Sequence, residues 1–208
     1  MPALNQSGQP QGDCPYNYRY IFSWQSSEKS LQKGFLRRNG GLMNLELIEL
    51  VKTVFDKTTS VTTPPMTLRA GNALDSYDLP SAYDRQLDKP TDEYLQQFAY
   101  WGLAYLDPIS WHYYLPFLIS YSLRNRTKDA PLESVLVVEA TLFSMRPPDR
   151  EPSRFSLLTT QQEEVITQFL EILAFEEDSN FQDYGMQVLE EYWLPGAIYR
   201  KYSRRQTC

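Results

Sequence analysis

Few residues in the sequence could act as a nucleophile, a general base or a soft metal ligand. The chain has one histidine, His112, and two cysteines, Cys14 and Cys208, which lie close to its two ends. It contains no CxxC, HExxH, P-loop, GxGxxG or GxSxG motif. These absences exclude most zinc hydrolases, the common nucleotide-binding folds and Ser-His-Asp hydrolases, apart from any that are built around His112.

The most suggestive polar side chains come from a loop-like stretch and from the segment that holds the histidine. They are Arg69, Asp75, Tyr77, Asp78, His112 and Tyr113. Two carboxylates three residues apart could bind a cation or share a proton, and a half-buried histidine near them would titrate close to neutral pH. The set would then form the site of a small hydrolase or a metal-dependent enzyme.

A structural interpretation of the same residues is favoured over the enzymatic one. Asp75 and Asp78 more often cap turns or bind an arginine than take part in catalysis. A single histidine in an aromatic helix is usually a hydrogen-bonded core residue. Because one histidine and two distant cysteines cannot supply a closed tetrahedral zinc site, we expect no structural metal and no cofactor.

The histidine belongs to residues 94–123, the densest run of aromatic and aliphatic side chains in the chain. Asp107 is a good helix N-cap and Pro108 is tolerated in a first helical turn, so two helices should meet there. Thr91 is a plausible cap for the first of them, and we expect the pair to form the centre of the core. The side chains expected to be buried at helical spacing are Tyr94, Phe98, Trp101 and Tyr105 in the first helix, and Ile109, Trp111, Tyr113, Leu115, Phe117, Leu118 and Tyr121 in the second.

Pro116 raises a question about the backbone of the second helix. It has no amide hydrogen, so the carbonyl of His112, four residues earlier, loses its helical partner. One possibility is that water or a side chain from the 75–78 segment satisfies that carbonyl, which would bring the loop to the helix. The other is that a new helix begins at Pro116.

The remaining helices are predicted from periodicity and from local start and stop signals. Apolar spacing predicts helices over residues 44–56, from Pro131 to the proline pair at 147–148, and over 181–193. Thr160 and Glu163 match a capping box and predict the start of another helix. Residues 66–90 should form an ordered loop with one helical turn at most, and residues 154–158 could form a short strand.

These elements predict a mainly α-helical single domain, with five or six helices around residues 91–124 and at most one short strand or hairpin. We expect residues 1–42 to be a disordered N-terminal extension, 43–196 to be the helical domain and 197–208 to be a basic tail. Met43 could also be the true start of translation.

The charge and hydropathy of the chain restrict its partners. A net charge of −6 and a pI near 4.9 argue against a nucleic-acid-binding domain, which usually has a basic face. The basic groups gather near both ends of the chain, where solvated tails are the more common explanation. The longest apolar run, residues 113–121, is shorter than the roughly 20 residues that a membrane helix needs. With no secretory signal in the sequence, we expect a cytoplasmic protein without membrane insertion.

Several segments together resemble a family of small uncharacterised bacterial proteins that is known only as a domain of unknown function. The segments are TLRAGNALDSYD, YLDPISWHYYLPFLISYSL, FSLLTTQQEEVITQFLEIL and VLEEYW, within residues 67–193. The most specific part is the signature Leu106-Asp107-Pro108 followed by Tyr113-Tyr114-Leu115-Pro116. The resemblance implies a bacterial origin and one shared domain, and it transfers no catalytic residue.

The function expected from these observations is non-enzymatic. Missing catalytic motifs favour an accessory or adaptor module that acts through an unidentified protein partner, in an oligomeric state that the sequence leaves open. Trp193, Tyr199 and Tyr202 near the C-terminus are candidate contact residues, because tyrosine and tryptophan are enriched in binding surfaces. The alternative is the small hydrolase or metal-dependent enzyme at Asp75, Asp78 and His112.

Overall fold

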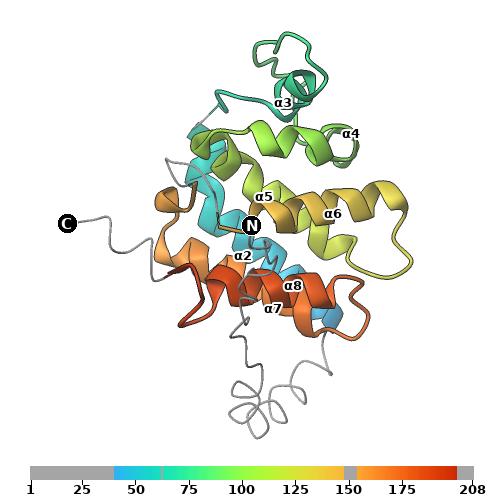
Figure 1. Ribbon diagram of the computed structural model, residues 1–208, viewed down its shortest axis with the longest axis vertical. Helices are drawn as coiled ribbons and strands as arrows, with labels where there is room; N and C mark the ends of the chain where they lie inside the picture. Colours follow the sequence, from blue (N-terminus) through green and yellow to red (C-terminus); the bar gives the residue numbers. More distant parts are fainter. Residues whose placement is uncertain (1–39, 62, 148–153, 201–208) are drawn as a thin grey trace, which may run out of the picture. The chain divides into compact units, whose positions relative to one another are not determined.

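A computed structural model describes residues 40–61, 63–147 and 154–200 of the chain (Figure 1). Within these residues it contains seven α-helices and no strand, which confirms the predicted mainly α-helical fold class. The α-helices are α2 (Gly40–Val61), α3 (Leu68–Asp75), α4 (Asp92–Gly102), α5 (Pro108–Arg124), α6 (Leu132–Ser144), α7 (Thr160–Phe175) and α8 (Gln182–Val188). The predictions for residues 1–39 and for 201–208 lie outside the described part of the chain.

Helix α5 is the element around which the others pack. Asp107 caps it as predicted, since its Oδ1 accepts hydrogen bonds from the amides of Ile109 and Ser110 at 2.9 and 3.0 Å. Helices α2, α6 and α7 all contact α5, so most of its side chains are buried. The helix continues through Pro116, and the alternative of a new helix beginning at that residue is therefore wrong.

Two further helix starts show how far local signals determine the fold. Thr91 caps α4 as predicted, and its side chain accepts from the amide of Tyr94. The predicted capping box exists one residue earlier than expected, between Thr159 and Gln162, so α7 begins at Thr160. Thr159 is followed three residues later by Gln162, and Thr160 by Glu163. Either pair could form a capping box, so the sequence alone did not determine which threonine caps α7.

Helix α3 is a two-turn element in a stretch that was predicted to be mostly loop. It crosses α4 so closely that a methyl group added to Gly71 would lie 2.5 Å from the carbonyl oxygen of Gly102. A methyl group added to Gly102 would overlap the carbonyl oxygen of Leu68. The two backbones therefore touch at a crossing that only glycine permits, and this contact stabilises a helix with weak intrinsic propensity.

The C-terminal part of the fold differs from the sequence predictions in two places. Residues Arg154–Leu157 form a 3-10 turn, η2, in place of the predicted strand. The last predicted helix divides into α8 and a π-helical segment, η3 (Leu189–Trp193). Trp193, predicted to be a surface contact, is buried and donates from Nε1 to the carbonyl of Met145 at 2.9 Å.

Several apolar side chains that were expected to face the core are exposed instead. In the central pair, Trp101 is 54% exposed, Tyr105 39% and Ile109 47%. The buried positions of α4 are those of Tyr94, Leu95, Ala99 and Gly102, so the face that packs on α3 and α6 is turned away from Trp101. No helix in the described ranges is both long and apolar enough to span a bilayer.

The close crossing of α3 and α4 predicts that Gly102→Ala destabilises the protein. Alanine normally stabilises an exposed helix position by about 1 kcal/mol relative to glycine. Here the added methyl group has no space, so we expect a loss of about 1–3 kcal/mol in the free energy of unfolding, measured by urea denaturation. Gln97→Ala, on an exposed position of the same helix, is the control, and a Gly102→Ala protein at least as stable as the parent would contradict the predicted contact.

Candidate functional site

The segment between α3 and α4, residues 76–91, is anchored by a buried ion pair. Arg69 of α3 donates from Nε and Nη2 to the two carboxylate oxygens of Asp88, at 2.9 and 2.8 Å. The Asp88 side chain is fully buried. Arg69 also donates to the hydroxyl of Ser81 and to the carbonyl of Ala82. The Arg69 guanidinium thus holds Ser81, Ala82 and Asp88 of the segment against α3. The bidentate pair with Asp88 also fixes the orientation of the guanidinium.

Two buried tyrosines extend this ion pair into the core. The hydroxyl of Tyr94 donates to Asp88 Oδ1 at 3.1 Å and accepts from the amide of Arg69 at 3.2 Å. It also lies 3.3 Å from the hydroxyl of Tyr114 on α5. The burial of Tyr114 raises the pKa of its hydroxyl well above the ordinary value, so the group stays protonated. This network connects α3, α4, α5 and the intervening segment.

The ionisation of Asp88 is set by two opposing effects. Burial raises the pKa of its carboxyl group, but the hydrogen bonds from Arg69 and from the amide of Asp84, together with the charge of Arg69, lower it by more. The pKa of Asp88 is therefore below its ordinary value and the carboxylate is charged at neutral pH. A buried charge of this kind requires its partner, and the whole segment depends on the pair.

The anchored segment presents large side chains to solvent. Tyr77 is fully exposed and has a φ angle of 62°, in the left-handed region that residues other than glycine seldom adopt. Leu79 is 93% exposed. Asp75 accepts a hydrogen bond of 3.0 Å from the hydroxyl of Tyr105, which places Tyr105 beside the end of α3.

Trp101 lies four residues before Tyr105 along α4 and the 3-10 turn η1 (Leu103–Tyr105), so the two side chains lie on the same side of this unit. The pKa of the Tyr105 hydroxyl is raised mainly by its hydrogen bond to Asp75, then by burial and the charge of Asp75, with a smaller contribution from Tyr77. We call Tyr77, Leu79, Trp101 and Tyr105 the Tyr77 surface. It combines aromatic and aliphatic groups on a backbone that the buried network holds in place.

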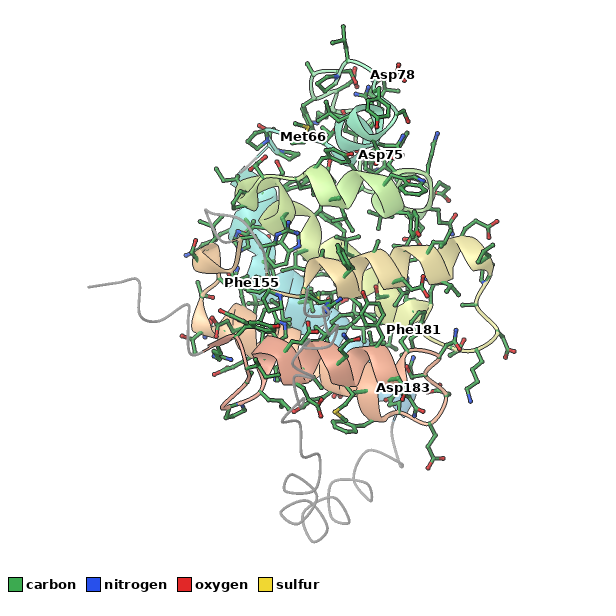
Figure 2. The ribbon with its side chains drawn as sticks, in the orientation of Figure 1. Met66, Asp75, Asp78, Phe155, Phe181 and Asp183 are labelled. Carbon is green, nitrogen blue, oxygen red and sulfur yellow. The ribbon has the colours of Figure 1, made fainter. Side chains whose placement is uncertain are left out.

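The structure assigns separate partners to the polar residues that the sequence grouped together. Arg69 binds Asp88, whereas Asp75 binds Tyr105. Asp78 is exposed, and its side chain makes no hydrogen bond within the described residues; Figure 2 shows it with Asp75 near the end of α3. Arg69, Asp75, Tyr77 and Asp78 are therefore brought together on α3 and the segment after it, without a shared ligand-binding geometry.

His112 and Tyr113 belong to a different environment on α5. The ring of His112 lies 5.6 Å from that of Phe55 on α2, and its Nε2 lies 3.0 Å from Oε1 of Gln162 on α7. That oxygen also accepts from the amide of Thr159, so the histidine nitrogen is the donor. Tyr113 packs in the core against the rings of its neighbours on α5.

No three histidine, cysteine or acidic side chains of the described residues are grouped so that they could hold a metal ion. Within that part of the chain, no hydrogen bond or ion pair joins His112 to Asp75 or Asp78. The residues that matter most for the site, Asp88, Tyr94 and Tyr114, were not in the predicted set. Asp88 lies 19 residues from Arg69, and Tyr114 lies 20 residues from Tyr94, and no local pattern marks pairs so far apart.

The fold and the site define a helical domain with an aromatic surface on a rigid support. The chain belongs to a family of unknown function, DUF6714, which it matches over residues 43–197. This agrees with the resemblance noted from the sequence. No curated protein and no solved structure matches the chain.

The buried ion pair predicts a pH-dependent loss of stability in Asp88→Asn. Removing one charge leaves Arg69 without its partner and should cost about 3 kcal/mol in the free energy of unfolding at pH 7. Because the folded pKa of Asp88 is lowered, its contribution is present above about pH 4 and is lost as pH falls through the folded value.

Urea denaturation of the parent and of Asp88→Asn at pH 7 and at pH 3 measures this effect. The difference between the two proteins should be smaller at pH 3. Asp78→Asn, which alters an exposed carboxylate, serves as control and should change stability by less than about 0.5 kcal/mol at either pH. Equal differences at both pH values would show that the charge of Asp88 is not what stabilises the segment.

His112 provides a second titration test, because it is the only histidine of the chain. Burial lowers the pKa of its ring, and the hydrogen bond to Gln162 raises the pKa by less. The ring resonance in NMR spectra should therefore titrate below about pH 6.5. Since the folded pKa is lowered, stability from the neutral ring is present above that pH and is lost as pH falls through the folded pKa.

Gln162→Met should lower the pKa of His112 further, because it removes the acceptor that favours the charged ring. A pKa at or above the ordinary histidine value in the untagged parent would contradict the burial of this ring.

Proposed function

We propose that this protein is a cytoplasmic bacterial accessory or adaptor module that binds a partner protein through the Tyr77 surface. The observation that carries the proposal is Tyr77 itself, a fully exposed aromatic ring on a left-handed backbone beside a buried ion pair. The bacterial origin rests on the resemblance noted from the sequence.

The energetics of the segment support a binding role. A left-handed conformation costs a residue with a side chain about 1–2 kcal/mol. At Tyr77 this conformation closes the C-terminus of α3, where the amides of Tyr77 and Asp78 donate to the carbonyls of Leu74 and Ala73. The ring of Tyr77 remains fully exposed, so its burial does not offset the cost. The buried charge of Asp88 likewise stabilises a segment whose most apolar side chains, Tyr77 and Leu79, face solvent.

The chemistry of the surface suits a protein partner. Tyrosine and tryptophan dominate the energetically important positions of protein interfaces, because they bury a large area with few rotatable bonds. Trp101 keeps an edge contact with Tyr100, with ring centroids 4.6 Å apart, and the Tyr105 hydroxyl is held by Asp75. The loss of side-chain freedom on binding would therefore be small.

Site-specific photocrosslinking tests the proposal. A photoreactive phenylalanine analogue at position 77 should give a discrete covalent adduct in cells that express the protein. The same analogue at position 199, where Tyr199 is also half exposed, is the control for general surface contact. Adducts of the same size and yield at both positions, or none at position 77, would contradict the proposal.

The partner identified in this way permits a quantitative test. Truncation of a central interface aromatic costs about 2 kcal/mol, so Tyr77→Ala and Trp101→Ala should each weaken binding roughly 30-fold. Tyr199→Ala should leave the affinity unchanged. Circular dichroism and thermal melting must show that the variants keep the parent fold, which is expected because all three side chains are substantially exposed.

A further inference from the structure

A second unpartnered apolar surface lies on the outer face of α6. Leu132 is 67% exposed and Phe143 is 61% exposed, and Leu136 is half-buried between them. At 100° per residue, these three positions lie within a narrow stripe on the side of α6 opposite its buried residues. The stripe runs for about 16 Å, or three helical turns, along the surface.

A concave site borders this stripe where α6 meets the start of α8. It has a volume of about 320 Å³. Figure 1 shows α6 and α8 side by side, and Figure 2 shows Phe181 and Asp183 in this region. The residues that line the site are Lys128, Glu139, Ser179, Asn180, Phe181, Gln182, Asp183 and Tyr184. Glu139 connects it to the stripe, since it lies on α6 one turn from Phe143 and one turn from Leu136.

Contacts of Arg126 and Thr127 with the segment between α7 and α8 fix the residues that border the site. Arg126 is buried and forms an ion pair with Glu176, and its carbonyl accepts from the amide of Asn180 at 2.8 Å. Thr127 and Ser179 form an isolated antiparallel bridge next to this contact. The concave shape is therefore fixed by the connections that enclose it, and it does not depend on a bound partner.

The charged groups of the site are available for binding. Lys128, Glu139 and Asp183 form no hydrogen bond or ion pair with any other residue that the structure describes. Of the residues that line the site, Glu139 and Asp183 are acidic and Lys128 is basic, which gives a net charge of −1. A groove that combines an apolar stripe with an excess of negative charge complements an amphipathic segment that carries basic residues.

We propose that the α6–α8 groove binds a basic amphipathic helix of a partner protein. The apolar residues of that helix lie along Leu132, Leu136 and Phe143. One of its lysine or arginine side chains enters the concave site, with its aliphatic stem on Phe181 and Tyr184 and its charge near Glu139 and Asp183. This groove is separate from the Tyr77 surface and does not rely on it.

A model peptide tests the groove without knowledge of the natural partner. The probe is a fluorescein-labelled 14-residue peptide of leucine, alanine and lysine, with leucines at positions i, i+4, i+7 and i+11 and lysines on the flanks. Fluorescence anisotropy with the full chain measures the affinity, and amide chemical shifts locate the contact. We expect shifts concentrated on α6 and residues 176–184, and binding at least tenfold weaker for a peptide with glutamate in place of lysine.

Matched variants separate specific docking from general attraction to an acidic protein. Glu139→Lys with Asp183→Lys should weaken binding at least tenfold, and so should Phe143→Ser, which leaves the charge unchanged. Glu46→Lys with Asp56→Lys changes the net charge equally on exposed positions of α2, and should change the affinity less than twofold. Tyr77→Ala should also have no effect on this peptide.

Equal weakening by the two charge-reversed proteins, shifts spread over the whole surface, or equal binding of the glutamate peptide would each overturn the proposal. Failure of the photocrosslinking experiment at position 77 would leave this result unaffected, because the two surfaces share no residue.

Discussion

The burial of α5 is the constraint on which the structure depends. Most of its side chains have almost no access to water, and the polar ends of its large rings bind partners on different neighbouring helices. Trp111 donates to Ser144 of α6, His112 to Gln162 of α7, and Tyr114 contacts Tyr94 of α4. Apolar burial alone would permit many arrangements of the surrounding helices. These hydrogen bonds, made by the polar ends of large rings, select one of them.

The same constraint explains why the segment after α3 is ordered. The Tyr94 hydroxyl lies within hydrogen-bond distance of Tyr114 on α5 and also donates to Asp88. The central helix is therefore connected through Tyr94 to the ion pair between Asp88 and Arg69. The glycine crossing of α3 and α4 brings that pair close to the core. A segment rich in proline and aspartate thereby acquires a fixed conformation, and its exposed apolar side chains are held in position.

Local signals in the sequence predicted the parts of this fold that depend on local interactions. The Asp107 and Thr91 caps were identified correctly, because a cap involves residues only two or three positions apart. Helix α3 was missed, since Gly71 lowers its propensity and its stability comes from α4. The grouping of His112 with Asp75 and Asp78 rested on residue type alone. The actual partners of His112 and Asp75 lie 50 and 30 residues away, where spacing carries no information.

The two proposed surfaces share one rigid scaffold, and this limits how they can influence each other. Helix α4 supports the Tyr77 surface and packs directly on α6, which carries the apolar stripe. Thermodynamic coupling between two sites requires an element with two arrangements that both ligands bias. Tyr121 of α5 joins α4 to α6, because its hydroxyl accepts from Gln96 at 2.8 Å and lies 2.7 Å from the hydroxyl of Ser134, and the structure shows one arrangement of this contact. We therefore expect binding at one surface to leave the affinity of the other nearly unchanged, as the proposed adaptor role requires.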